Sequence, residues 1–185
     1  MEGSLIQQII TQLALPEISK VDPNLQQVPE IEDYTILQKL TQASVPAVLL
    51  GIANITVDKN EEQDSYNATG RSLHMQLIFP KNYDQIVQSI AAYAGAPAQD
   101  TRSFLEQIAM AAESVILENL GADANVLQIR DYVIGEKHKI FFYLPPQLHL
   151  GTLMGDPSQD DRTKKMEGPF SNIAHKIEDG LSKPE

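Results

Sequence analysis

Apolar residues recur at three- and four-residue spacing along most of the chain, a pattern that predicts α-helices. The first run extends from Leu5 to Leu13, with Ser4 placed to cap the helix and Pro16 to stop it. The second run extends from Ile36 to Ala53, and a kink or a restart is expected at Pro46 because proline has no amide hydrogen. This second helix is apolar on nearly every side, so it should lie at the centre of the core.

The second half of the chain carries further helical patterns. The spacing predicts a helix over Ile86–Ala94 capped by Gly95, a helix over Phe104–Leu120 ended by Gly121, and a helix that Asp123 can cap, which continues to Leu144 and stops at Pro145, with Gly135 as a place of interruption. A last amphipathic helix is expected after Pro169, over Phe170–Leu181.

Two short segments leave the choice between helix and strand open. In residues 72–79, apolar Leu73, Met75, Leu77 and Phe79 alternate with other side chains, as in a strand. A lone strand would have no partner for its backbone, so a short helix is the better interpretation. Residues 139–144 are rich in aromatic and β-branched side chains, and a short strand remains an alternative to the end of the preceding helix.

These patterns predict an all-α protein, a compact bundle of about six to seven helices in one domain over residues 1–185. Residues 37–52 repeat the apolar pattern of residues 105–120, and each is preceded by a shorter helix, which suggests two related helix-pair lobes. The expected organisation is lobe 1 over 1–57, an acidic loop over 58–70, lobe 2 over 71–144, and an irregular strap with a final helix over 145–185.

Composition excludes several classes of function. The formal net charge is −11, and the basic stretch Arg162–Lys165 is bracketed by acidic residues, so we expect no nucleic-acid partner. The absence of cysteine excludes disulfides and thiolate chemistry. Residues 41–57 fall short of the roughly 20 apolar residues that a membrane helix needs, and the first residues lack the basic region of a signal peptide. We therefore expect a cytoplasmic protein without membrane insertion.

Several segments resemble the bacterial YidB-like domain family of unknown function. They are SVPAVLLGI at 44–52, LHMQLIFPKNYDQIVQSIAAYAGAP, FLEQIAMAAESVILENLG and VIGEKHKIFFYLPPQLHLG, and the resemblance covers roughly residues 35–155. It implies an all-helical fold and a bacterial source, and it brings no activity and no catalytic residue. The chain departs from the family in having fewer glycines and in its segments 58–70 and 156–185.

One segment has the spacing of a calcium-binding loop. Oxygen-bearing residues occupy the first, third, fifth and twelfth positions, namely Asp156, Ser158, Asp160 and Glu167. However, Asp161 stands where such a loop needs glycine for its sharp turn, so a solvated turn is the better interpretation. The four histidines, His74, His138, His149 and His175, share no metal-ligand spacing. We predict no metal site, no cofactor and no catalytic residue.

Two functions from different classes remain. The first is a non-catalytic interaction or scaffold protein of bacterial type; the alternative is a small-molecule-binding protein or enzyme with a pocket between the helical lobes. A protein partner or self-association is expected to use residues 145–168, because this segment mixes charges with Leu148, Leu150, Leu153 and Met154. These apolar side chains either pack on the chain's own helices as a strap or contact the partner.

Overall fold

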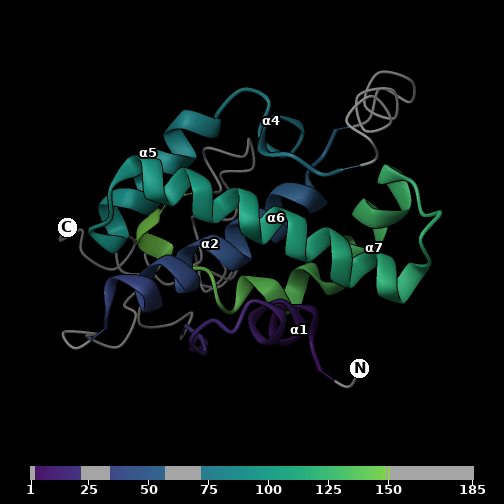
Figure 1. Cartoon of the computed structure of the whole chain (residues 1–185), viewed down its shortest axis with the longest axis horizontal. Helices are drawn as coiled ribbons and strands as arrows, with labels where there is room; N and C mark the ends of the chain where they lie inside the picture. Colours follow the sequence, from purple (N-terminus) through teal and green to yellow (C-terminus); the bar gives the residue numbers. More distant parts are fainter. Residues whose placement is uncertain (1–2, 22–33, 57–71, 149, 151–185) are drawn as a thin grey trace, which may run out of the picture.

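The chain folds around helices, as its spacing predicts. The computed structural model describes residues 3–21, 34–56, 72–148 and 150, and these contain six α-helices and no strand (Figure 1). The helices are α1 (Leu5–Gln12), α2 (Ile36–Ala53), α4 (Met75–Ile78), α5 (Tyr83–Ala94), α6 (Ala98–Leu120) and α7 (Val126–Phe141), followed by the 3-10 turn η1 (Pro146–Leu148). The prediction of an all-α fold is confirmed.

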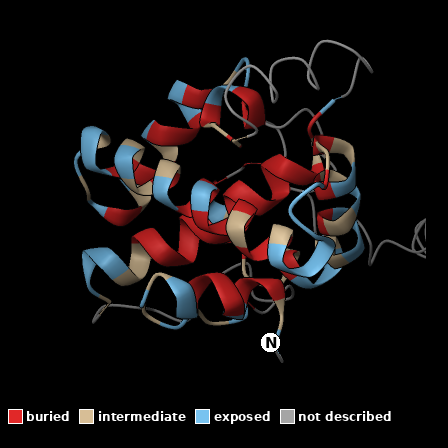
Figure 2. Ribbon diagram, turned by 45° about the vertical axis from the view of Figure 1, so that its right-hand side comes forward, coloured by how far each residue is buried: buried red, intermediate tan, exposed pale blue. Residues whose placement is uncertain are grey.

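Helix α2 lies at the centre, and its burial explains the arrangement of the others. It is buried at every position from Leu40 to Ala53. Helices α5, α6 and α7 pack against it, and α1 lies against α6. Figure 2 shows buried segments meeting in the interior while the outer faces of the surrounding helices are exposed. The single core therefore runs through both expected lobes.

Length and apolar content would also allow α2 to cross a membrane. Among the described residues it is the only helix that is long and apolar enough to do so. However, 78% of this 18-residue helix is buried inside the protein. Core helices of soluble proteins also meet this condition.

The restart expected at Pro46 does not occur, because α2 continues through this residue. Proline removes one backbone hydrogen bond, at a cost of about 3 kcal/mol in a helix interior. Packing on all sides of α2 offsets that cost. The helix begins with a capping box. The backbone N–H of Gln38 donates to Thr35 Oγ1 (3.2 Å), and the backbone N–H of Thr35 donates to the side-chain Oε1 of Gln38 (2.8 Å).

Two helix ends are formed by other residues than expected. Helix α1 begins after Ser4 as expected and ends at Gln12, one residue before the predicted Leu13. Ala14 ends it rather than Pro16, because Ala14 adopts a left-handed conformation (φ 49°) and the Leu15 backbone amide donates back to Ile10 O (2.9 Å). Helix α7 is capped by Asn125 rather than by Asp123. The Asn125 side chain accepts from the Gln128 amide (3.0 Å), which completes a second capping box.

Each of the two ambiguous segments is helical in part, and neither contains a strand. Residues 75–78 form α4, and α7 passes Gly135 without interruption and ends at Phe141. Residues 142–144 then form turns rather than the last turn of the helix or a strand. The glycines at the ends of α5 and α6 act as predicted, since Gly95 (φ 70°) and Gly121 (φ 103°) both take positive φ values.

The first residues of the expected strap pack on the helical body. Leu148 and Leu150 are both buried, and η1 contacts α5. This is the placement that the strap interpretation requires of these two leucines. Leu153, Met154 and the helix expected after Pro169 lie outside the described residues, as does the acidic segment 58–70.

Glycine is required at one position of α2 and not in α7. A Cβ atom at Gly51 would overlap the Phe79 ring and lie 2.5 Å from Ile78 Cγ2. Both neighbours are buried, so neither can swing away. A Cβ atom at Gly135 meets nothing within 4 Å. The close approach of residues 78 and 79 therefore depends on the missing side chain at Gly51.

We predict opposite effects of the same substitution at these two glycines. Gly51→Ala should lower the free energy of unfolding by about 1–3 kcal/mol, because overpacking outweighs the gain in helix propensity. Gly135→Ala should raise it by roughly 0.5–1 kcal/mol through propensity alone. Urea denaturation at low protein concentration measures both, and a stabilising Gly51→Ala would contradict the packing described here.

Candidate functional site

The sequence-derived metal candidates do not converge in the described part of the chain. Asp156, Ser158, Asp160 and Glu167 lie outside it, as do two of the histidines, His149 and His175. Of the other two, His74 precedes α4 and His138 lies in the last turn of α7. No group of three or more histidine, aspartate or glutamate side chains within the described ranges could hold a metal ion.

A buried amide joins three distant segments. Gln42, in α2, has no exposed surface. Its Oε1 accepts from the Ser19 amide (2.9 Å), and its Nε2 donates to Ser19 O (3.0 Å) and to Tyr143 O (2.6 Å). Beside it, the Val21 amide donates to Phe142 O (2.6 Å). The segments that follow α1 and α7 are thereby held together against α2.

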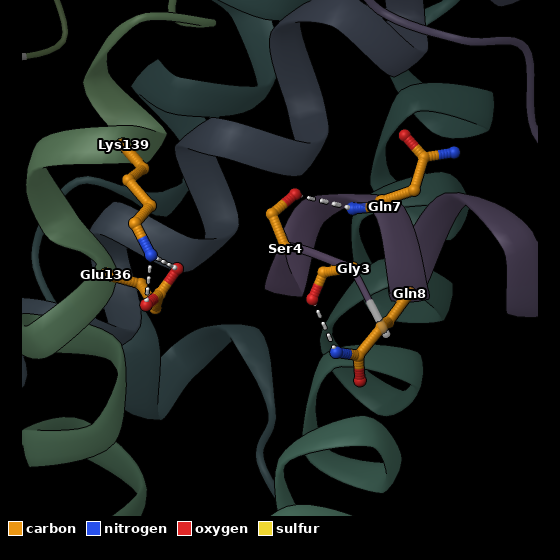
Figure 3. A network of polar contacts seen from close by, with 6 residues as sticks. All are labelled: Gly3, Ser4, Gln7, Gln8, Glu136 and Lys139. Atoms are coloured by element: carbon orange, nitrogen blue, oxygen red, sulfur yellow. Dashed lines mark hydrogen bonds and ion pairs between the residues drawn. The ribbon is translucent and has the colours of Figure 1, made fainter. Parts of the chain in front are cut away.

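This junction forms one wall of a pocket of about 200 Å³. The pocket lies between the start of α1 and the last turns of α7. Figure 3 shows the Glu136–Lys139 pair on α7 and Ser4 at the start of α1, with the Ser4 hydroxyl turned toward the Gln7 amide. The lining residues of the pocket are Ser4, Leu5, Ile6, Lys20, Glu136, Lys139, Ile140, Phe142 and Tyr143. They come from both halves of the chain, which is where the alternative function places a pocket.

The pocket combines apolar walls with a small excess of positive charge. Lys139 Nζ pairs with Glu136 Oε1 (2.9 Å), and the exposed Lys20 adds a second ammonium group. Two cations therefore face one carboxylate, in a chain whose net charge is −11. The Ser4 side chain is already used, since its Oγ accepts from the Gln7 amide (3.3 Å). The volume is below the roughly 300–1,000 Å³ of pockets for drug-sized ligands, so only a small molecule would fit.

A second polar cluster joins α5 to α6. Tyr83 OH donates to Glu106 Oε1 (3.2 Å), and Arg102 lies over the Tyr83 ring (4.9 Å to its centroid) while pairing with Asp84 (2.9 Å). Burial raises the pKa of Tyr83 to about 12, and the neighbouring Glu106 carboxylate adds to the rise. The phenol therefore stays protonated at neutral pH and acts as a hydrogen-bond donor between the helices, not as a base or a nucleophile.

The third feature is the outward face of α7. Leu127, Asp131, Ile134, His138 and Phe141 follow one another at alternating spacings of four and three residues, so they form one seam along the helix. Ile134 is 45% exposed although Val133 beside it is fully buried. Asp131 and His138 are exposed, and Leu127 and Phe141 are half-buried. We call these five residues the α7 seam.

Sequence reasoning placed a possible pocket between the lobes but identified neither the residues that line it nor the seam. The pocket residues are separated by more than a hundred positions, and no local motif links Lys20 to Glu136. The sequence did not single out the seam, because adjacent apolar residues on a helix can both face the core, as the buried Ile86 and Val87 do in α5. The pattern of α7 therefore did not show that Ile134 is exposed while Val133 is buried.

We predict that Tyr83 makes the protein less stable at alkaline pH. The native state holds the phenol proton more tightly than the unfolded state, whose tyrosine has a pKa near 10. This contribution to stability is complete below pH 10 and is lost as the pH rises toward 12. Between pH 9 and pH 11 the free energy of unfolding of the wild-type protein should fall by about 1 kcal/mol more than that of the Tyr83→Phe variant, as measured by urea denaturation. Equal losses in both proteins would contradict this assignment.

Comparisons of the chain with protein-family models, with curated proteins and with solved structures gave no match. The resemblance to YidB-like domains therefore stays a prediction that rests on the sequence segments quoted above.

Proposed function

We propose that this chain is a non-catalytic interaction protein of bacterial type, and that the α7 seam receives a helix of a partner protein. The observation that carries this proposal is Ile134. It is a large apolar side chain at the centre of a well-formed helix, and 45% of it is exposed. Half-buried apolar side chains lie one heptad away on either side, at Leu127 and Phe141, and part of the Phe141 ring packs against the core of the protein itself. Such spacing is typical of helices that dock along one face.

The glycine beside Ile134 supports a docking face. A glycine in a helix interior costs roughly 0.5–1 kcal/mol relative to alanine. Gly135 has ordinary helical geometry, so the backbone of α7 does not require a glycine at this position. A Cβ atom at Gly135 would also meet none of the described residues within 4 Å, so no close packing requires a glycine. A missing side chain on an open face lets another helix approach closely. Met110 of α6 is more exposed, at 63%, but it has no comparable apolar row around it.

The polar clusters of the described residues hold parts of the fold together, and this favours a binding protein over an enzyme. Tyr83 is held in its protonated form between α5 and α6, and Gln42 uses its amide to join three segments. Glu136 is paired with Lys139 on the same helix. A general base or a nucleophile needs a reactive protonation state and access to a substrate.

We predict that a photo-reactive residue at position 134 crosslinks to a partner in cells that naturally express the chain. The Ile134→benzoylphenylalanine variant should give a specific adduct, because its side chain would lie in the interface. The same residue at Met110 should give none. The adduct at 134 should also disappear when Gly135→Glu is added, since a charge would then be buried in the contact. Equal adducts at 134 and 110, or none at either, would contradict the proposed surface.

The pocket between α1 and α7 favours a second candidate function, the binding of a small carboxylate. Lys20 and Lys139 would pair with the carboxylate, and Leu5, Ile140 and Phe142 would cover an apolar body. A cavity of about 150 Å³ is known to accept benzene, so this pocket suits a single ring or a short alkyl chain. For a ligand of that size we expect a Kd on the order of 1 mM.

We predict that benzoate, used as the probe, raises the thermal stability of the protein in a saturable way, as binding to the native state requires. The neutral analogue benzamide should have a smaller effect, because it lacks the charge that pairs with lysine. Lys20→Gln should weaken the response to benzoate several-fold. Lys81→Gln, at an exposed lysine that does not line the pocket, is the matched control. If benzamide acts as strongly as benzoate, or if Lys20→Gln responds like the control, the carboxylate site is wrong.

A further inference from the structure

We infer that the partner at the α7 seam is a second copy of this chain, with the two α7 helices packed antiparallel and crossing at Ile134. This inference rests on the proposed function, since it names the occupant of the same surface. It is argued from the order of residues along the seam, from their exposure and from their charges.

The seam is self-complementary when its direction is reversed. It reads Leu127, Asp131, Ile134, His138, Phe141, so the order of apolar and polar residues is the same in both directions. Leu127 and Phe141 are each seven residues from Ile134, whereas Asp131 is three residues before it and His138 four residues after it. An antiparallel pair aligned at Ile134 places Leu127 of one copy beside Phe141 of the other. Ile134 then meets its own counterpart, as an interface with a two-fold axis requires. A parallel pair would instead place like charges together at Asp131.

The polar positions of the seam also match. With Ile134 on the axis, position 131 of one copy is opposite position 137 of the other, so Asp131 and His138 differ from exact register by one residue, a rise of about 1.5 Å. That offset is small enough for the carboxylate to meet an imidazole N–H on each side of the axis. Both side chains are exposed and therefore accessible. His138 packs edge-on against Phe142 (5.1 Å between ring centroids), and Asp131 is held by Arg130 of the same helix (2.7 Å). These contacts position both groups before a second copy arrives.

The space at the crossing point allows close approach. Ile134 projects outward, and Gly135 next to it leaves open space where a side chain would stand. The isoleucine of each copy can therefore lie against the bare backbone of the other. A single 16-residue helix offers less area than the roughly 800 Å² per partner of standard interfaces. We therefore expect weak dimerisation, with a Kd on the order of 0.1 mM.

The chain has no cysteine, so disulfide trapping can report the geometry directly. Under mild oxidation, Ile134→Cys should give covalent dimers quickly, because residues on the axis come within the short Cα separation that a disulfide needs. Leu127→Cys alone should not, whereas a mixture of Leu127→Cys and Phe141→Cys should give the mixed dimer. Met110→Cys is the control for random collision. Rapid self-crosslinking of Leu127→Cys, or Ile134→Cys no faster than Met110→Cys, would overturn the antiparallel pairing.

Sedimentation of the full, unmodified chain gives an independent measure. The wild-type protein should show reversible dimerisation between roughly 10 µM and 1 mM, and Ile134→Asp should remain monomeric while Met110→Asp behaves like wild type. Asp131→Lys and His138→Asp should each weaken the dimer about tenfold, and the double variant should recover most of the loss, because opposite charges face one another again. A wild-type chain that stays monomeric throughout overturns self-association.

The outcome for self-association is separable from the outcome for the proposed function. If the purified chain is monomeric but position 134 still crosslinks to a different protein in cells, the seam is an interaction surface and its partner is not a second copy. If neither experiment gives an adduct or a dimer, both inferences are wrong.

Discussion

Helix α2 has no polar face to turn toward water, and this constraint shapes the rest of the molecule. From Leu40 to Ala53 every residue is buried, so the other helices must cover it on all sides. Polar groups within it need internal partners. Thr41 Oγ1 donates to the Leu37 carbonyl (2.8 Å), and the Gln42 amide bonds to two other segments. Ser44 Oγ is buried and has no hydrogen-bond partner among the described residues.

The sequence predicted features that depend on local chemistry. The central place of α2 followed from its apolar composition, and the ends of α5 and α6 followed from Gly95 and Gly121. Where two residues could serve the same role, the choice required the full local pattern rather than the cap residue alone. Asp123 and Asn125 are both good caps, but only Asn125 has a glutamine three residues later to complete the box. The end of α1 was predicted to within one residue, but the helix stops through the positive φ of Ala14 rather than through Pro16.

The pocket and the seam depend on which side of a helix faces the core, and the sequence does not state this. The pattern in α7 is weakly amphipathic, so Val133 and Ile134 were equivalent candidates for the core. Contact with α2 and α6 decides between them. The pocket is harder to predict than the seam. Its walls come together only in the folded protein, where the segments around Ser19 and Tyr143 both bond to the side chain of Gln42. No spacing along the chain reports that meeting.

The hydrogen bonds of Gln42 also determine how the pocket can move. Ser19 and Tyr143 are held by the same side chain, so one pocket wall cannot shift without disturbing the segment from the other half of the chain. Separating them would break bonds to a buried amide that has no access to water, and each such group costs about 1–3 kcal/mol when left unpaired. The pocket is therefore present before any ligand arrives. A molecule that enters it would spend little of its binding free energy on ordering the protein, and its rate of entry would be set by diffusion rather than by a conformational change.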